Sequence, residues 1–217
     1  MTLAIEARKL ADYISSLESF EKHEVDNDLC YHHIGALYTD IILQSGLNYN
    51  TVVKPRVQRL LIEYPDYYTT LEFIKLISEH SLEKLIRWTH PVKINRLLRL
   101  VDFSIENDIN TCIDLKSFLL AAGNQERLLE LNGIGPKTID YALKLLNFDT
   151  VAVDRHIYSF VELADIKING YQITKRVVEY AADFLQVSRS SIDYSIWKYM
   201  SANERVSQPT KQYELDF

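Results

Sequence analysis

Residues 131–138 read LNGIGPKT and form a glycine-containing turn between two stretches of helical periodicity. Gly133 and Gly135 allow positive φ angles and leave no side chain between the backbone and a ligand. Pro136 suits the first position of a helix, where its missing N–H group costs nothing. We expect the turn to bind a phosphate, because the free N–H groups and the positive dipole end of that helix would point outward. A tight turn between two helices without a ligand would explain the same glycines.

Lys137 lies in the first turn of the helix predicted after these glycines. A lysine with a pKa of about 10.4 is a poor nucleophile at neutral pH, but burial beside other cations lowers that pKa and frees the amine. The positive end of the helix dipole would disfavour the ammonium further. Lys137 is therefore the candidate nucleophile, and a lysine that binds phosphate or is merely exposed is the alternative.

Asp154 is the second candidate and lies within residues 151–157, which read VAVDRHI. It follows an apolar stretch and precedes the helix predicted at 155–163. Aspartate is among the best N-cap residues and stabilises a helix by about 1 kcal/mol, so a cap is the simplest role. A capping carboxylate is also held rigid and ionised, which suits a group that must stabilise positive charge. The two roles are compatible.

Helical periodicity continues through almost the whole chain, and neither an alternating strand nor a repeat of fixed period is evident. The pattern predicts an all-α protein with about ten to twelve helices. Asp114 is a candidate N-cap for one of them, and Ser190 and Ser191 are candidates for another. The predicted helices span residues 3–17, 31–43, 52–61, 71–77, 82–88, 94–103, 115–120, 126–131, 137–146, 155–163, 171–185 and 192–200.

Together, the two motifs resemble the helix-hairpin-helix signature of the endonuclease III and 8-oxoguanine glycosylase superfamily (HhH-GPD). In that family the hairpin reads L-P-G-[VI]-G-x-K-[TV] and the catalytic segment reads V-D-x-H. A weaker resemblance covers roughly residues 28–200. Within it, residues 41–44, IILQ, are similar to a family L-[LS]-x-Q helix end, and residues 91–94, PVKI, resemble an N-x-K-A element. The chain departs from the pattern in having Asn132 in place of the usual proline and a slightly shorter spacing between the motifs.

The resemblance implies two helical domains with a cleft between them. Residues 28–140 would form a helical barrel domain that ends in the helix-hairpin-helix. Residues 1–27 together with 141–202 would form a second helical domain that carries Asp154. Residues 203–217 are polar and lack periodicity, so we expect them to form a flexible tail.

The resemblance also implies a base-excision-repair DNA glycosylase with abasic-site (β-elimination) lyase activity. Such enzymes flip a damaged nucleotide out of the duplex. Lys137 would attack the anomeric carbon of the sugar, displace the base and form a Schiff base, after which β-elimination nicks the strand. Asp154 would activate the amine or stabilise the oxocarbenium-like transition state. Gly133 and Gly135 would bind a phosphate, and Gln44 would fill the gap that the flipped base leaves.

Two other functions are compatible with the same residues. In a monofunctional DNA glycosylase, Asp154 would activate water and Lys137 would only bind phosphate. In a non-catalytic helix-hairpin-helix protein, the turn would bind DNA without chemistry. The two cysteines, Cys30 and Cys112, are too few to hold the family's iron–sulfur cluster, so we expect no cluster, although hairpin carbonyls could hold a monovalent cation. The identity of the damaged or mismatched base does not follow from the sequence.

Composition and charge restrict the partners. The chain has 217 residues, of which 47% are hydrophobic, and a net charge of −6, as in an ordinary globular protein. It shows neither a signal peptide nor a membrane-spanning stretch, so we expect an intracellular monomer of the cytoplasm or nucleoid. Double-stranded DNA would contact a local basic stripe. The candidate members of this stripe are Lys54, Arg56, Arg59, Lys93, Arg96, Lys137 and Arg155. Residues 212–217, QYELDF, resemble a tail that binds a sliding clamp.

Overall fold

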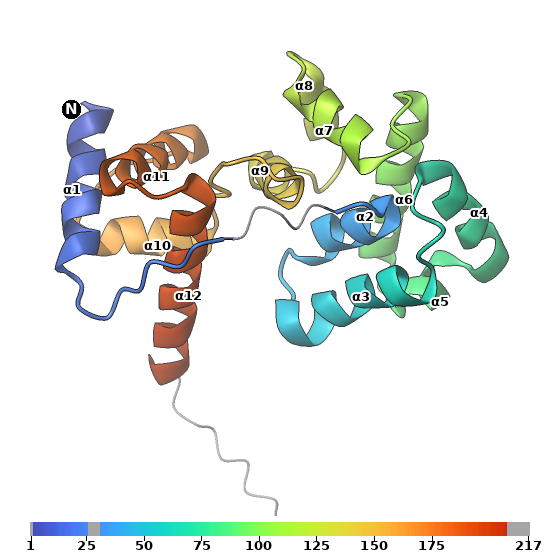
Figure 1. The fold of residues 1–217 in the computed structure, drawn as a ribbon, viewed down its shortest axis with the longest axis horizontal. Helices are drawn as coiled ribbons and strands as arrows, with labels where there is room; N and C mark the ends of the chain where they lie inside the picture. Colours follow the sequence, from blue (N-terminus) through green and yellow to red (C-terminus); the bar gives the residue numbers. More distant parts are fainter. Residues whose placement is uncertain (1, 26–30, 208–217) are drawn as a thin grey trace, which may run out of the picture. The chain divides into compact units, whose positions relative to one another are not determined.

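The computed structural model describes residues 2–25 and 31–207, and all regular secondary structure in these ranges is helical (Figure 1). Twelve α-helices and one short π-helix occur there, without a β-strand in the described part of the chain. The predicted all-α class is therefore confirmed. None of the helices in the described ranges combines the length and the apolar character that a membrane span needs.

Contacts between Cα atoms divide the chain into two compact units. Unit 1 combines Met1–Val25 with Asp149–Phe217, whereas unit 2 is the continuous stretch Asp26–Phe148. Unit 1 is therefore assembled from both ends of the chain, and unit 2 from its middle.

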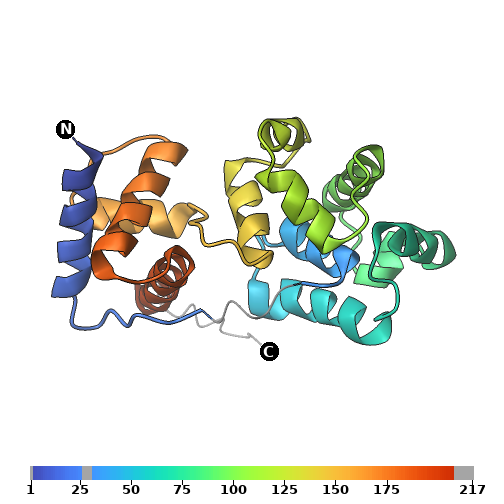
Figure 2. The same cartoon turned by 45° about the horizontal axis from the view of Figure 1, so that its top comes forward.

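Unit 1 contains a pair of helices that are far apart in sequence and lie side by side. Helix α1 (Leu3–Ser16) packs along α11 (Tyr171–Leu185), as Figures 1 and 2 show. The buried apolar residues of α1 recur at three- and four-residue spacing, which gives the helix one apolar face. These residues are Ala7, Leu10, Ala11 and Ile14. Helices α10 (Arg155–Leu163) and α12 (Arg189–Ser207) complete the unit and contact each other.

Unit 2 is built around α2 (Ile34–Leu43), whose residues are all buried. A helix that is buried on every side belongs in the centre of a core, and α2 accordingly contacts several neighbours. The other helices of unit 2 are η1 (Tyr49–Val53, a π-helix), α3 (Lys54–Glu63), α4 (Thr70–His80), α5 (Leu82–Ile86), α6 (Pro91–Glu106), α7 (Cys112–Leu120), α8 (Asn124–Leu129) and α9 (Pro136–Leu145).

Helix α9 is the last element of unit 2. The domain boundary that the sequence predicted at residue 140 falls inside this helix, whereas the contacts divide the chain between Phe148 and Asp149. The helix belongs to unit 2 because it packs on α2, α7 and α8.

Two predicted helix caps differ from those in the structure. Helix α7 begins after Thr111, whose side chain accepts a hydrogen bond from the Asp114 N–H, while the Asp114 carboxylate accepts one from the Thr111 N–H. This reciprocal pair is a capping box, so Asp114 is its third helical residue rather than the cap. At the start of α12, the hydroxyl that accepts the Ser191 N–H belongs to Ser188 at 3.0 Å. In both cases the capping residue lies two or three residues earlier in the chain than predicted.

Helix α12 continues to Ser207. It therefore includes the first residues of the tail predicted at 203–217. The remainder of that tail, with the clamp-binding resemblance at 212–217, lies outside the described residues.

Candidate functional site

The glycine-containing turn joins α8 to α9 and has two different glycines. Gly133 has a φ of +87°, in the region that favours glycine. Gly135 has a φ of −120° and is the N-cap of α9 in extended backbone, as N-cap residues usually are. Of the two glycines, only Gly133 uses the positive φ that glycine allows. Because Gly135 has no side chain, α9 has no side-chain cap, although the Gly135 carbonyl accepts the Thr138 N–H at 2.9 Å.

Arg96 on α6 lies against Gly133. A Cβ atom at position 133 would come within 2.2 Å of Arg96 Nε and 2.3 Å of its Cζ. Arg96 also donates a long hydrogen bond from Nη2 to Oδ1 of Asn132 at 3.4 Å. The absence of a side chain at Gly133 therefore allows a guanidinium to approach the turn.

Lys137 and Gln44 were both predicted to act at the site, and the structure brings them together. Lys137 Nζ, in the first turn of α9, donates to Gln44 Oε1 at 2.9 Å across 93 residues of sequence. A lysine ammonium only donates hydrogen bonds, so the carboxamide oxygen must face it. The Gln44 Nε2 atom is buried and has no hydrogen-bond partner among the described residues. Gln44 is therefore oriented by the lysine.

Lys93 lies next to this pair and binds the end of α2. Its ammonium donates to the carbonyl oxygens of Ile42 at 2.6 Å and Ser45 at 2.9 Å. These carbonyls belong to a helix end, where such groups lack partners within the helix and where a cation is favoured. Burial, and then the neighbouring positive charges of Arg96 and Lys137, lowers the pKa of Lys93 to about 8. Three of the seven predicted stripe residues thus form a cationic cluster: Lys93, Arg96 and Lys137.

A buried carboxylate lies one helical turn from Gln44. Asp40 on α2 is completely buried and accepts a hydrogen bond from the Tyr141 hydroxyl on α9 at 2.8 Å. Tyr141 is itself one turn from Lys137, so two parallel contacts, Asp40 with Tyr141 and Gln44 with Lys137, join α2 to α9. No local sequence pattern indicated Asp40, because its partners come from distant segments.

Other members of the predicted stripe are engaged in backbone contacts. Arg56 donates to the carbonyls of Val52 at 2.6 Å and Arg87 at 3.1 Å, and Arg59 donates to the carbonyl of Lys84 at 2.8 Å. These two arginines join α3 to the segment around α5. They have a structural role there in addition to their charge.

Asp154 is the N-cap of α10 in unit 1, as predicted. Its Oδ1 accepts hydrogen bonds from the N–H groups of His156 at 2.9 Å and Ile157 at 3.1 Å. The side chain of Asp154 is half-buried, and the neighbouring Arg155 is exposed. The carboxylate is thereby held at one orientation with partial access to solvent.

The segment before Asp154 is supported by α12. The Ala152 N–H donates to Oδ2 of Asp193 at 2.7 Å, and the Ser190 N–H donates to Oδ1 of Asp149 at 2.8 Å. Val151, Ala152 and Val153 are all buried without belonging to a helix. A backbone N–H buried in this way requires an acceptor, and Asp193 provides one. Sequence reasoning missed Asp193, which lies within a helix and belongs to no motif.

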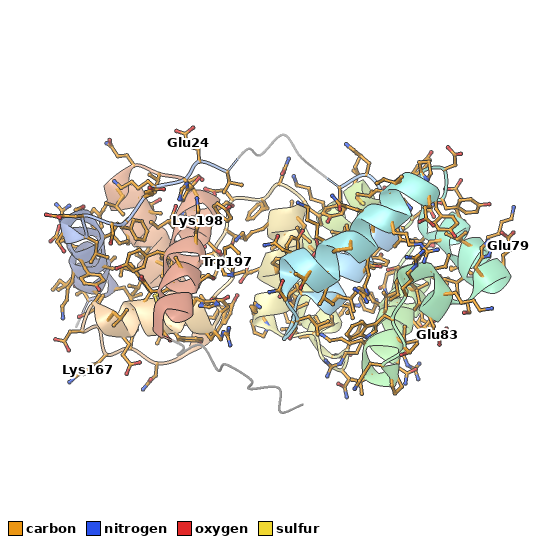
Figure 3. The ribbon with its side chains drawn as sticks, turned by 90° about the horizontal axis from the view of Figure 1, so that it is seen from below. Glu24, Glu79, Glu83, Lys167, Trp197 and Lys198 are labelled. Carbon is orange, nitrogen blue, oxygen red and sulfur yellow. The ribbon has the colours of Figure 1, made fainter. Side chains whose placement is uncertain are left out.

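The candidate residues are distributed over both units. Lys137, Gln44, Gly133 and Gly135 belong to unit 2, whereas the Asp154 and Arg155 pair belongs to unit 1. Trp197 lies on α12 (Figure 3) and is half-buried. Its ring stacks on that of Tyr194, with ring centroids 5.9 Å apart. No protein-family model matches this chain, and a comparison with curated proteins finds no match for it.

Proposed function

We propose that the protein is a DNA glycosylase of base excision repair with abasic-site lyase activity, in which Lys137 is the nucleophile. The observation that supports this most is the position of Lys137. It is half-buried in the first turn of α9 and lies near Lys93, which is also close to Arg96. Neighbouring positive charge and a helix N-terminus both disfavour an ammonium ion, and an amine is activated in this way in covalent catalysis.

In the proposed reaction, the amine nitrogen of Lys137 attacks the anomeric carbon of a damaged nucleotide. The glycosidic C–N bond breaks, and the base leaves with the bonding electrons and takes up a proton. The sugar ring then opens to give a Schiff base with Lys137, and O4′ takes up a proton that the amine loses. Removal of a proton from C2′ then drives β-elimination, in which the C3′–O bond breaks and the 3′ phosphate leaves with the bonding electrons. Asp154, held by two N–H groups of α10, would stabilise the positive charge that develops on the sugar.

The proposed substrate is double-stranded DNA that contains a damaged or mismatched base. Phosphate contacts position a protein on DNA without reading its sequence, and the turn at Gly133 offers such contacts through its backbone, through Arg96 and through the start of α9. Gly135, Gln44 and Arg155 are the further proposed DNA contacts. We propose no iron–sulfur cluster or other resident cofactor, apart from a monovalent cation on the turn. The protein would act as a monomer.

Borohydride trapping tests the lysine directly. A duplex that contains an abasic site is incubated with the protein and sodium borohydride, and the covalent adduct is measured by gel electrophoresis. The wild-type protein should form the adduct and Lys137→Ala should form none. Lys144→Ala, which changes a lysine in the last turn of the same helix, should retain it. An undiminished adduct in Lys137→Ala would refute the nucleophile.

Base release over a panel of lesion duplexes tests Asp154 and identifies the substrate. Asp154→Asn should slow release of the preferred base by about 100-fold or more. Release without an adduct would instead indicate a monofunctional glycosylase in which Asp154 activates water. Salt-dependent DNA binding with neither release nor adduct would indicate a non-catalytic DNA-binding protein.

A further inference from the structure

The contact between Gln44 and Lys137 suggests a further residue for the proposed reaction. We infer that Gln44 is a positioning residue that orients the Lys137 amine, and that Lys93 fixes the turn that carries Gln44. The inference rests on the proposed function for its chemistry. The contact itself is a property of the protein without DNA.

The carboxamide of Gln44 can hold the lysine in both of its protonation states. An ammonium ion donates to Oε1 at the observed distance of 2.9 Å. A neutral amine has two N–H donors and one lone pair, so it can keep the same bond and leave the lone pair for the electrophile. A neutral carboxamide also stabilises the ammonium less than a carboxylate would. The residue type therefore suits an amine that must lose its proton.

The position of Gln44 is fixed by its backbone and by Lys93. Gln44 ends α2, and its N–H donates to the carbonyl of Asp40 at 3.0 Å. Lys93 binds the carbonyls of Ile42 and Ser45 on either side of Gln44 in the sequence. The carboxamide is therefore carried by a turn that is held at both ends.

A second contact between the same helices limits their relative movement. The Tyr141 hydroxyl on α9 donates to the buried carboxylate of Asp40 on α2. Because Tyr141 and Asp40 are each one turn from the residues of the first contact, α2 and α9 are joined at two levels. The distance between Gln44 and Lys137 is therefore determined by the packing of two helices rather than by a flexible loop.

Single-stranded DNA separates this role from the gap-filling role that the family resemblance implies for Gln44. A single-stranded oligonucleotide with an abasic site offers the aldehyde to Lys137 but has no opposite strand and no gap. Borohydride trapping is measured on it at saturating protein, and the dissociation constant is measured separately by fluorescence anisotropy. Circular dichroism checks that each variant is folded.

Gln44→Met keeps the size of the side chain and removes the acceptor. We expect the trapping rate to fall by about 10- to 100-fold on single-stranded and duplex DNA, and because the rate is measured at saturating protein, a change in DNA affinity does not enter it. Trapping of single-stranded DNA at the wild-type rate would overturn the inference, since Gln44 would then act only where a gap exists.

Gln44→Glu should change the pH dependence of trapping, which a purely structural role of Gln44 would leave unchanged. A carboxylate would form an ion pair with Lys137, so trapping should be slow at neutral pH and recover at higher pH. Charged groups near this pair include Lys93 and Arg96 on α6, Asp40 one turn along α2 and the buried Asp140 one turn along α9. A pH profile identical to that of Gln44→Met would contradict the inference.

Lysine labelling in the absence of DNA separates failure of this inference from failure of the proposed function. The protein is acetylated with a low concentration of acetic anhydride, and labelling of Lys137 relative to Lys144 is measured by mass spectrometry. Gln44→Glu should slow labelling of Lys137 several-fold at neutral pH, and an unchanged ratio would refute the coupling. A wild-type protein that forms no DNA adduct would refute the lyase function, while the labelling ratio would still decide whether Gln44 controls Lys137.

Discussion

The carboxylate of Asp40 accepts hydrogen bonds from three tyrosine hydroxyls that come from separate parts of unit 2. Tyr31 precedes α2 and donates at 2.6 Å, Tyr49 begins η1 and donates at 3.2 Å, and Tyr141 lies on α9 and donates at 2.8 Å. Burial raises the pKa of Tyr49 to about 12, so its hydroxyl remains a donor at neutral pH. One residue thus connects a loop, a π-helical turn and the helix that carries Lys137.

Asp40 should give the stability of the protein an unusual pH dependence. Burial raises the pKa of Asp40 above its usual 3.8, although the tyrosine hydrogen bonds oppose the shift. The folded protein then holds the proton more tightly than the unfolded chain. The stability contributed by this group is therefore full below pH 3.8 and is lost as pH rises through the folded pKa.

Asp40→Asn removes this ionisation. The free energy of unfolding of the wild type, relative to that of Asp40→Asn, should fall as pH rises from about 4 to 7. Urea unfolding at several pH values measures it, with Asp102→Asn on the exposed side of α6 as control. A difference between wild type and Asp40→Asn that rises with pH would show that the hydrogen bonds, and not burial, dominate.

At the scale of helices, the sequence predicted the bounds of a helix best where a capping residue or a glycine marks its end. Helix α10 has the predicted bounds because Asp154 caps it, and α11 begins directly after Gly170, as its periodicity indicated. The π-helix Tyr49–Val53 was not predicted, since its altered hydrogen bonding has no residue signature and the apolar pattern around Val52 fits an ordinary helix. Helix α12 is longer than predicted because helical structure continues beyond its apolar pattern into polar residues.

In the candidate site too, the residues that belong to a local motif could be predicted, and the contacts between distant segments could not. Lys137 and Asp154 could be recognised from short motifs, because each follows a local pattern of glycines or apolar residues. The contacts of Lys137 with Gln44, and of Ala152 with Asp193, join residues 93 and 41 positions apart in the sequence. One sequence carries no signal for such pairs, since they depend on how whole helices pack.

The link between α12 and the segment before Asp154 can be tested by removing its acceptor. Asp193→Ala would leave the buried Ala152 N–H without this partner, which should lower the free energy of unfolding by about 1–3 kcal/mol. Asp193→Asn keeps a carbonyl acceptor of the same reach and should lose less. Urea denaturation compares the two, and equal losses in both variants would contradict a hydrogen-bonding role.

At the scale of the molecule, the two units differ in how the chain forms them. Unit 2 is continuous, whereas unit 1 needs α1 from one end and α10 to α12 from the other. Helix α1 supplies four buried apolar residues to the core of unit 1. Those residues have no substitute in the rest of that unit.

Because only unit 2 is formed by a continuous segment, fragments of the chain should differ in whether they fold. Residues 26–148 alone should retain a helical circular dichroism spectrum and unfold cooperatively. Residues 149–217 alone should show little cooperative unfolding, because the apolar face of α11 would lose its partner, and addition of a peptide of residues 1–25 should restore it. A cooperative transition in 149–217 without the peptide would show that α1 is dispensable for this core.

The pairing of α1 with α11 also imposes an order on events in the cell. A ribosome adds about 5–20 residues per second, so α11 is completed roughly 10–30 s after α1. Unit 2 is formed by one continuous segment that is synthesised during that interval, so we expect it to fold before α11 is complete. The apolar face of α1 therefore stays without its partner helix until the final third of the chain has been synthesised. Translation speed, and chaperones that cover a nascent helix, are therefore expected to influence how much of the protein reaches its native state.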